Sequence, residues 1–418
     1  MIQKPRGTKD IYGLDVQIYQ NIFQTFETIA HQFNLQRIIT PMFEAYELFR
    51  DTTGEVSDIV QKEIYKFEDF GKRLLALRPE GTAPVGRAII ENKLFLEKKY
   101  NKLYYIGSMF RYERPQKGRL RQFYQIGVEL IQELNVYSVL ETILIGHSFL
   151  QQLQINDYKL VLNSLGLLAE RQAYVEELKT YFTKHQAALS ATSQKRIVTN
   201  PLRILDDKID NQLPVVQQAP KINQFWSQQS QDEFSQLLQL LDLLKIDYEI
   251  DYSLVRGLDY YSNIVFEFVS DSVHLGEKAT LIGGGCYLDL VHSKSNPING
   301  VGFGCGVERL FEIIKGQNQV ENTLKVDLYF ILENKKQYQI ALPLIYQLRA
   351  LNYQVEFNYI VKKYNKLFQE ANYFQAQLII FQELNQQQSL FWTIKKGQTK
   401  TTCQLDQLIA TIEKLHSQ

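Results

Sequence analysis

The sequence has few of the features that are typical of secreted proteins, of proteins with structural zinc sites or of membrane proteins. Only three of its 418 residues are cysteines, Cys286, Cys305 and Cys403, and no CxxC pair occurs. A disulfide framework or a structural zinc site is therefore not expected, and a reducing compartment suits the chain. No apolar run reaches the length of a membrane span, and the first 13 residues lack the apolar core of a signal peptide. These absences predict a cytoplasmic protein that does not enter a membrane.

The chain also lacks an excess of charge of either sign. Lys and Arg together number 46, as do Asp and Glu, so the formal net charge is zero. This balance argues against a protein that coats nucleic acid non-specifically, although a local basic patch would still allow an enzyme to grip RNA. None of the six histidines stands in a nucleophile–base pattern, so hydrolase triads have no support. The length allows two or three domains.

Hydrophobic periodicity predicts a first region, up to about residue 320, of strands with flanking helices. Apolar residues recur at steps of three and four from Val16 to Phe33, which is one face of a helix. Helical character is also expected over 135–153, and the Gln- and Leu-rich stretch 169–246 indicates an inserted helical module. The strands expected in this region are 35–40 (ended by Pro41), 64–68, 73–77, 103–113, 121–129, a strand from 247, 264–270 and 299–304, with a turn at Gly283-Gly284-Gly285 and a helix over 306–315.

A polar linker is expected at 316–323, and the chain changes character beyond it. Strands then alternate with helices up to the end of the sequence. This alternation predicts a small separate α/β domain over 325–418. The strands expected there are 326–332, 354–357, 378–381 and 391–395, and the helices are 336–351, 367–374 and 405–415.

The strand 121–129 carries the first candidate site. Because side chains alternate along a strand, Arg121, Phe123, Gln125, Gly127 and Glu129 share one face. A glutamine and a glutamate separated by a glycine fit the floor of a polar pocket better than a buried apolar face. The alternative is a sheet face that is left to solvent.

Cationic side chains stand beside this strand. Arg111 and Glu113 are expected on one face of the preceding strand, followed by the basic loop 114–119. Arginine suits bidentate contact with phosphate, so a nucleotide-phosphate site is expected there; the alternative is a salt bridge from Glu113 to Arg121. Arg309 falls in the first turn of a predicted helix, where the helix dipole disfavours a cation. An anionic ligand would explain this placement, and a tolerated exposed arginine is the alternative.

Two further segments complete the candidate site. In the segment 78–82, Glu80 is suited to an ammonium group and Thr82 to a hydrogen bond beside it, although both also suit the capping of a helix. The octet 254–261, Leu-Val-Arg-Gly-Leu-Asp-Tyr-Tyr, sets the guanidinium of Arg256 beside two adjacent phenols. This combination suits a ligand with an anionic part and a small polar ring. No Walker loop or dinucleotide fingerprint is present, and Cys286 with His292 offers too few ligands for a metal.

Taken in order, these segments resemble histidyl-tRNA synthetase, a class II aminoacyl-tRNA synthetase. The segments 35–44, 110–129 and 300–310 resemble the three motifs of the class, and 78–82 and 254–261 resemble motifs of the histidine enzyme within it. The resemblance covers essentially the whole chain. It implies an α+β class II catalytic domain over 1–320, an antiparallel sheet flanked by helices, with a helical insertion at about 169–246, and a C-terminal α/β anticodon-binding domain over 325–418.

The resemblance also implies an activity. Such an enzyme activates L-histidine with ATP, accompanied by Mg²⁺, to histidyl-adenylate and pyrophosphate. It then transfers histidine to the 3′ end of tRNA(His) and releases AMP. Members of the family are homodimers, and no metal ion fixed by protein ligands is implied.

The roles implied by the resemblance fall on residues already singled out. Arg256 and Arg111 would contact the α-phosphate of ATP and Arg309 the triphosphate from the other side, and these three would be catalytic. Glu113 would touch the adenine, Phe123 would stack on it, and Arg119 would reach the outer phosphates. Gln116 and Lys117 would meet the acceptor end of tRNA. The histidine-binding residues would be Glu80, Thr82 and Gln125 at the amino group and Glu129, Tyr260 and Tyr261 around the imidazole.

The sequence departs from the family pattern at one position, and two other functions are considered. The family usually has Gly-Gly-Arg-Tyr where this chain has Cys286 before Tyr287, with Leu288 next. One alternative is a catalytically inactive paralogue that regulates the first enzyme of histidine biosynthesis, but such proteins typically lack the anticodon-binding tail. The other is an RNA-binding module with a degenerate nucleotide pocket, which the zero net charge and the intact polar site weigh against.

Overall fold

The structure is a computed structural model that describes residues 2–54, 57, 59–97, 101–131, 134–207, 209–256, 258, 260–276, 278–291, 297–317, 325–384 and 390–416. The chain divides into two compact units, Met1–Val320 and Glu321–Gln418. In the described part of the chain, no hydrophobic cluster mixes residues of the two units. Each unit therefore has a core of its own and is described by itself.

The first unit is built on a large sheet whose described strands follow the order β1-β5-β6-β11-β10-β9-β7-β8. Neighbours from β5 to β7 are antiparallel, whereas the pairs β1–β5 and β7–β8 at the two edges are parallel. These strands are β1 Gln36–Arg37, β5 Lys102–Phe110, β6 Gln122–Leu130, β7 Lys159–Ser164, β8 Tyr248–Ile250, β9 Tyr261–Ser270, β10 Ala279–Tyr287 and β11 Gly300–Gly306. The antiparallel centre is what the resemblance implied.

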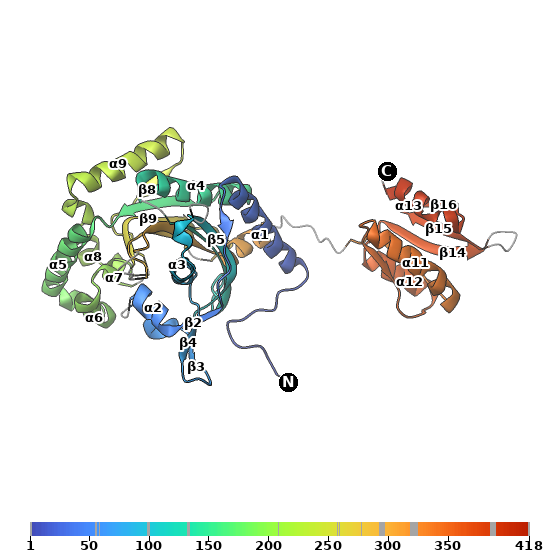
Figure 1. Ribbon diagram of the computed structural model, residues 1–418, viewed down its shortest axis with the longest axis horizontal. Helices are drawn as coiled ribbons and strands as arrows, with labels where there is room; N and C mark the ends of the chain where they lie inside the picture. The colour runs from blue at the N-terminus through green and yellow to red at the C-terminus, as the bar shows by residue number, and fades with distance from the viewer. Residues whose placement is uncertain are drawn as a thin grey trace. The chain divides into compact units, whose positions relative to one another are not determined.

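One face of this sheet carries the main hydrophobic core. Apolar side chains of β6, β9 and β11 meet those of helices α1 Leu14–Gln32, α4 Val136–Gln152, α9 Gln228–Leu243 and α10 Val307–Gly316. Figure 1 shows α1, α4 and α9 along the same side of the sheet. The helix expected from residue 16 to 33 is confirmed by α1, whose buried side chains recur at helical spacing.

The helix expected over 135–153 is confirmed by α4. It begins after Asn135, whose side-chain oxygen accepts hydrogen bonds from the backbone N–H groups of Tyr137 and Ser138 at 2.9 and 3.1 Å. This arrangement satisfies two donors that the first turn of a helix leaves without partners.

The other face of the sheet has a row of glycines at its centre. Gly127 of β6 pairs with Gly304 of β11, which pairs with Gly283 of β10. A Cβ atom at these positions would meet the side chains of Tyr105, Gln125 and Arg256, respectively. The three central strands therefore leave a trench in the sheet, and polar side chains from neighbouring positions lie over it.

The glycines of β10 correct one expectation. Gly283-Gly284-Gly285 was expected to form a turn, but it lies inside β10 and is paired on both sides. Gly284 faces the core, where an added Cβ would come within 2.6 Å of Phe266 and 2.7 Å of Phe303. These glycines allow neighbouring side chains to pack closely against both faces of the strand, and they do not change the direction of the chain.

Two other strand predictions were too long, and the strand expected over 121–129 is shifted by one residue. The strand expected over 35–40 is reduced to β1, since Ile38 N–H already bonds to Tyr104 O outside the ladder and Pro41 follows. The strand 103–113 ends at Phe110, where pairing with Gln122 stops. Arg111 and Glu113 therefore lie beyond β5, and Arg121 precedes β6, with its N–H bonded to Gly7 O at 2.8 Å.

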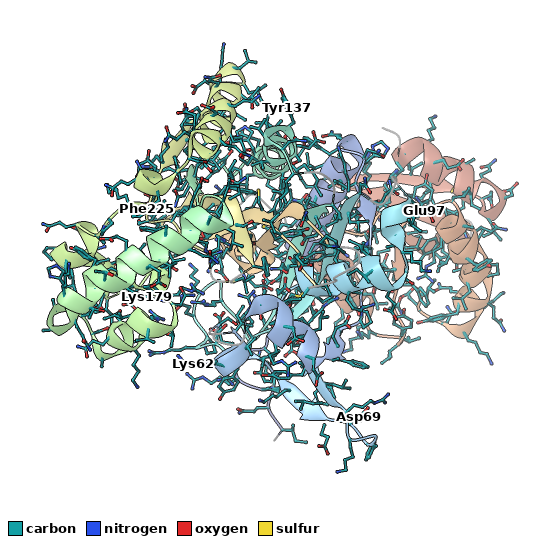
Figure 2. All side chains as sticks on the ribbon, turned by 60° about the vertical axis from the view of Figure 1, so that its left-hand side comes forward. Lys62, Asp69, Glu97, Tyr137, Lys179 and Phe225 are labelled. Carbon is teal, nitrogen blue, oxygen red and sulfur yellow. The ribbon has the colours of Figure 1, made fainter. Side chains whose placement is uncertain are left out.

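A smaller sheet stands on the glycine-row side of the unit. Strands β2 Phe43–Ala45, β4 Leu74–Leu77 and β3 Lys66–Glu68 pair antiparallel in that order, so the strands expected over 64–68 and 73–77 are confirmed and form a hairpin. Helices α2 Tyr46–Thr53 and α3 Thr82–Glu91 follow β2 and β4. Figure 2 shows Asp69 at the tip of the β3–β4 hairpin, which projects from the unit.

The helical segment 169–246 divides into two parts. Helices α5 Leu168–Lys184, α6 Ala191–Thr199, α7 Leu202–Leu205 and α8 Pro214–Gln217 surround a hydrophobic cluster of their own. Helix α9 instead contributes Phe234, Leu237 and Leu241 to the main core and so covers the sheet. Below, the insertion means the part with its own cluster, α5 to α8.

The second unit is a five-stranded sheet in the order β13-β12-β14-β15-β16. Helices α11 Lys335–Ala350 and α13 Leu408–His416 pack on one face, and α12 Tyr364–Tyr373 packs on the other. The expected alternation of strands and helices is confirmed, but β16 was missed because its residues, Thr-Lys-Thr-Thr-Cys, lack an apolar alternation. Its strands are β12 Leu328–Phe330, β13 Val355–Phe357, β14 Leu378–Leu384, β15 Leu390–Lys396 and β16 Thr399–Cys403.

Among the described residues, no helix combines the length and the apolar character that crossing a bilayer requires.

Candidate active site

A cleft of about 240 Å³ lies over the glycine row of the large sheet. Its walls come from the start of α3, from β6, β9 and β10, from the start of α10 and from the loop that follows β5. Strongly polar side chains of both signs line it. The chemically distinctive members are Glu80, Thr82, Tyr105, Arg111, Glu113, Arg119, Phe123, Gln125, Arg256, Tyr260, Tyr261, Thr280, Glu308 and Arg309.

One end of the cleft is acidic and deeply buried. Glu80 accepts hydrogen bonds from the backbone N–H groups of Thr82 at 2.7 Å and Ala83 at 2.8 Å, so it caps α3. The Thr82 hydroxyl donates to Glu129 at 2.7 Å, and the Tyr287 hydroxyl donates to the other oxygen of Glu129 at 2.9 Å. The capping alternative considered for Glu80 is therefore realised, while its carboxylate still lines the cleft.

Burial shifts the acid–base behaviour of this end. Glu129 is only 1% exposed and lies near Glu80. Burial, with the nearby Glu80 carboxylate, raises the pKa of Glu129 to about 8, although the bonds from Thr82 and Tyr287 act in the opposite direction. Burial also raises the pKa of Glu80, against the two backbone hydrogen bonds that favour its charged form. This end thus holds carboxyl groups that a cationic or N–H-donating ligand would stabilise in their ionised form.

The opposite wall of the cleft is cationic. The Arg111 guanidinium donates to Pro79 O at 2.8 Å and stands 5.5 Å from the centre of the Phe123 ring. Glu113 forms an ion pair with Arg119 and lies 3.9 Å from Arg111. The alternative of a salt bridge from Glu113 to Arg121 is not realised, because Arg121 donates to the backbone carbonyl of Glu113 at 3.2 Å.

Arg256 and Arg309 complete this wall. Arg256 forms an ion pair with Glu267, whose other oxygen accepts from the Thr280 hydroxyl at 2.7 Å. The Nε atom of Arg256 is buried without a partner. Arg309 donates to the backbone carbonyl of Thr280.

The cationic wall carries uncompensated positive charge. Burial lowers the pKa of Arg309 to about 10, and the charges of Arg119, Arg111 and Arg256 add to this. Four arginines thus face the carboxylates of Glu113 and Glu267. Such mutual repulsion in a partly buried site is relieved when an anion binds, so this wall is suited to a polyanionic ligand.

The first turn of α10 contains one acidic residue that sequence reasoning missed. Glu308 accepts the backbone N–H of Tyr124 at 2.9 Å and the Tyr19 hydroxyl at 3.4 Å. Its other oxygen is buried without a partner, and burial raises its pKa to about 7. The carboxylate ties β6 and α1 to the turn that carries Arg309.

The structure brings most of the expected site residues together. Glu129 lies behind Thr82 rather than on the cleft surface. Gln116 and Lys117 do not line the cleft; Gln116 bridges to Arg119 in the loop, and Lys117 stands 3.8 Å from Glu312. The expected residues that line the cleft are Glu80, Thr82, Arg111, Glu113, Arg119, Phe123, Gln125, Arg256, Tyr260, Tyr261 and Arg309.

Two further side chains at the site were missed by sequence reasoning. Tyr105 pairs with Gly127 across the sheet and its hydroxyl lies 3.2 Å from Gln125 Oε1, to which it donates. Alternation along the strand after Leu103 would have placed Tyr105 on the cleft face. Glu267 holds Arg256 from the neighbouring position of β9, and only the strand register reveals that contact.

Cys286, which stands where the family usually has arginine, faces away from the cleft. Its side chain is buried in the main core, and burial raises the pKa of its thiol to about 12. The neighbouring Tyr287 points to the cleft side and reaches Glu129. Leu288 is partly exposed beyond the strand, and His292 lies outside the described residues. The replacement of the family's usual arginine by Cys286 therefore alters packing in the core and leaves the cleft side of β10 unaltered.

Within the described ranges, no three His, Cys, Asp or Glu side chains gather in a way that would hold a metal ion. The carboxylates nearest the cationic wall, Glu113 and Glu267, are already paired with arginines.

The antiparallel sheet, its covering helices and the cleft between an acidic pocket and an arginine wall define a class II aminoacyl-tRNA synthetase. A family profile described as histidyl-tRNA synthetase matches residues 7–310. The chain belongs to the histidyl-tRNA synthetase family.

Individual relatives agree with this assignment. The chain is 41% identical to a histidine–tRNA ligase of Malacoplasma penetrans over 383 residues, which are 91% of this chain and 90% of that protein. It is 40% identical to one of Streptococcus agalactiae over 405 residues, 96% of this chain and 94% of the relative. The crystal structure of apo S. aureus histidyl-tRNA synthetase superposes with a TM-score of 0.82 at 31% identity and covers 100% of both chains.

The buried Glu129 predicts a pH dependence of stability. Its pKa lies above the ordinary value of 4.5, so between about pH 4.5 and 8 the folded protein holds a proton that the unfolded chain has released. The free energy of unfolding should therefore fall as pH rises through this window, by at most about 1.4 kcal/mol per pH unit from this group. Glu129→Gln removes that slope, so the variant should gain stability relative to the parent protein from pH 5 to pH 8.

Urea titrations of both proteins across that range measure the difference. Glu176→Gln, on the exposed side of α5, is the control for the general effect of removing a carboxylate. A stability difference between Glu129→Gln and the parent that stays constant with pH would show that Glu129 does not titrate in this window.

Proposed function

We propose that the protein is a histidine–tRNA ligase, which joins L-histidine to ATP as histidyl-adenylate and then passes histidine to the 3′ end of tRNA(His). One observation carries the proposal. A single cleft is lined by four arginines at one end and by the buried Glu80 and Thr82 at the other, where the Thr82 hydroxyl donates to a second buried carboxyl group, that of Glu129. This pairing complements a triphosphate next to an amino acid whose ammonium and imidazole both carry N–H donors.

The acidic end is proposed to bind histidine. The Glu80 carboxylate accepts hydrogen bonds from the ammonium group, because a cation favours the ionised form of a buried carboxyl group. Thr82 and Gln125 offer further oxygen acceptors beside it. Tyr260 and Tyr261, which line the cleft, meet the imidazole together with Glu129, whose carboxyl group lies directly behind Thr82. A site built from buried polar groups rejects amino acids that leave those groups unpaired, by as much as roughly 10⁴–10⁵-fold in known cases.

The cationic wall is proposed to bind ATP, with magnesium entering as part of the substrate MgATP. Arg111 and Arg256 contact the α-phosphate, and Arg309 holds the triphosphate from the opposite side. The adenine stacks on Phe123 beside Glu113, and Arg119 reaches the outer phosphates. The existing ion pairs of Arg119 with Glu113 and of Arg256 with Glu267 orient these arginines before substrate arrives.

In the proposed reaction, the histidine carboxylate attacks the α-phosphorus of ATP and pyrophosphate leaves. Negative charge develops on the α-phosphate oxygens as the new bond forms. Arg256 and Arg111 stabilise that charge with guanidinium groups that are permanently ionised and already oriented. Holding both substrates in line contributes further, up to roughly 7–11 kcal/mol in well-oriented systems.

The RNA substrate is proposed to contact both units of the chain. The loop 114–119 carries Gly118 and Arg119 on the cleft wall and Gln116 and Lys117 outside it, so the acceptor end of tRNA would pass this loop to reach the adenylate. The second unit is proposed to bind the anticodon. Its separate core lets it hold a distant part of a long RNA. The proposed compartment is the cytoplasm, where translation uses charged tRNA.

A homodimer is proposed through the segment 35–44 and the small sheet that this segment enters at β2. Large apolar side chains are exposed there, and the Phe43 and Phe67 rings of β2 and β3 lie 6.5 Å apart. The Phe70 side chain, at the hairpin tip, is fully exposed. A two-fold partner that covers the same patch would remove this apolar surface from water. The exposed members are Ile39, Met42, Phe43, Phe67, Phe70 and Leu74.

The catalytic role proposed for Arg256 gives the first test of function. Arg256→Ala should lower histidine-dependent ATP–pyrophosphate exchange about 10²–10³-fold, because one preorganised charge on the transition state is lost. Arg256→Lys keeps a cation for Glu267 but lacks the planar fork, so it should fold normally and recover little activity. Thermal unfolding is measured in parallel. Near-normal exchange by Arg256→Ala would remove Arg256 from the mechanism.

Removal of residues 325–418 tests the division of labour between the two units. Because the first unit has its own core, the truncated protein should keep histidine-dependent pyrophosphate exchange and lose most tRNA charging. Charging by the truncated protein at the rate of the full chain would assign the second unit another function.

Sedimentation velocity at micromolar concentration tests the dimer. The parent protein should sediment as a dimer, and Phe43→Asp combined with Phe67→Asp should give a monomer, because both side chains are exposed in the single chain and their replacement leaves its core intact. Tyr346→Asp, at an even more exposed aromatic position in the second unit, should remain dimeric. A parent protein that is monomeric and active would rule out the proposal.

A further inference from the structure

The helical insertion contacts the segment that carries Arg256 and Tyr261. Val255 and Tyr261 are buried members of the insertion's own hydrophobic cluster, together with Leu165, Tyr174 and Leu178. Leu254, Leu258 and Tyr260 pack against that same cluster. This segment thus packs against the core of the insertion through its apolar side chains, while Arg256, Leu258 and the two phenols also line the cleft.

Two polar side chains fix the ends of this segment. Asn163, the fifth residue of β7, is fully buried, and its amide donates to Leu254 O at 2.9 Å. Arg171, in the first turns of α5, donates to Tyr261 O at 2.5 Å. Arg171, Arg256 and Tyr261 also line one small cavity behind the cleft.

We propose that Arg171, with Asn163, is a positioning residue for amino-acid activation, through which the insertion holds Arg256 and Tyr261 in their cleft-facing orientation. Arg171 does not line the cleft, so it acts through the backbone of Tyr261 rather than on substrate. Tyr261 is the first residue of β9, and Arg256 lies in the segment that leads into this strand. A charged donor on that carbonyl limits how far both side chains move before substrate binds.

The position of the contact makes the effect selective. Arg111 and Phe123 come from the β5–β6 hairpin and Arg309 from α10, and none of these elements contributes to the insertion's cluster. Loss of the Arg171 contact should therefore disturb the histidine end and the reacting centre more than the nucleotide end. The inference rests on the proposed function for its kinetic readout, but the positioning itself is measurable without any substrate.

The experiment compares Arg171→Met, Arg171→Lys and Tyr174→Phe in the full-length protein. Arg171→Met keeps an unbranched stem and removes the donor, whereas Arg171→Lys restores a charged donor. Tyr174→Phe is the matched control, since the Tyr174 hydroxyl also donates from α5 to a backbone carbonyl, that of Pro220 at 3.0 Å, but away from the cleft. Lys179, on the outside of α5 in Figure 2, offers a second control as Lys179→Ala.

In ATP–pyrophosphate exchange, Arg171→Met should lower kcat/KM for histidine about tenfold, the loss of one hydrogen bond from a charged donor, and leave KM for MgATP within about twofold. Arg171→Lys should recover part of the loss, and both controls should match the parent protein. A merely structural role would lower the active fraction and leave both KM values unchanged. Normal kinetics of Arg171→Met, or an equal loss in Tyr174→Phe, would overturn the proposal.

Amide hydrogen exchange of the ligand-free proteins gives the second readout. Peptides that contain Leu254 and Tyr261 should exchange faster in Arg171→Met than in the parent protein, and at the parent rate in Tyr174→Phe. Unchanged exchange in Arg171→Met would overturn the positioning role whatever the activity. If the parent protein lacks histidine-dependent pyrophosphate exchange, the proposed function fails, and the hydrogen-exchange comparison still decides the structural inference.

Discussion

The site depends on a row of glycines where the three central strands of the large sheet meet. Gly127, Gly304 and Gly283 are paired in one row, and no side chain rises from the sheet there. The space is taken by Tyr105, Gln125 and Arg256, which reach over the row from its flanks. On the opposite face the same strands carry a continuous apolar core, so the sheet opens toward one side only.

The trench separates two kinds of charge. At one end, burial raises the pKa of both Glu80 and Glu129, so these carboxyls gain from a ligand with N–H donors. At the other end, burial lowers the pKa of Arg309 to about 10, and repulsion from Arg119, Arg111 and Arg256 adds to this shift. The charged groups at each end are therefore stabilised by the ligand proposed to bind there. That ligand is an amino acid at the first end and a triphosphate at the second. The reacting carboxylate and α-phosphate would meet between them, beside Arg256.

The sequence predicted the parts of this site that depend on local rules. Strand alternation placed Gln125 and Glu129 on one face, and the helix dipole pointed to Arg309 as a residue in need of an anion. The separate α/β tail followed from periodicity, whereas the antiparallel arrangement of the first unit was implied by the family resemblance. Resemblance to a family supplied the roles, which alternation and charge alone left open.

What the sequence did not predict depends on contacts between distant strands. Glu267 as the partner of Arg256 and Tyr105 over Gly127 are set by register, which no local pattern fixes. The glycines of β10 looked like a turn because glycine is common in turns, and only the side chains on both faces explain them as strand residues. Cys286 looked like a change at the site until its side chain was placed in the core.

The central claim is that the acidic end of the cleft, opposite the arginines, selects histidine for activation by ATP. Amino-acid-dependent ATP–pyrophosphate exchange, run with each proteinogenic amino acid in turn on the full-length protein, tests it most directly. The account predicts exchange with histidine and none above background with any other amino acid. Exchange with a different amino acid, or with none, would contradict it.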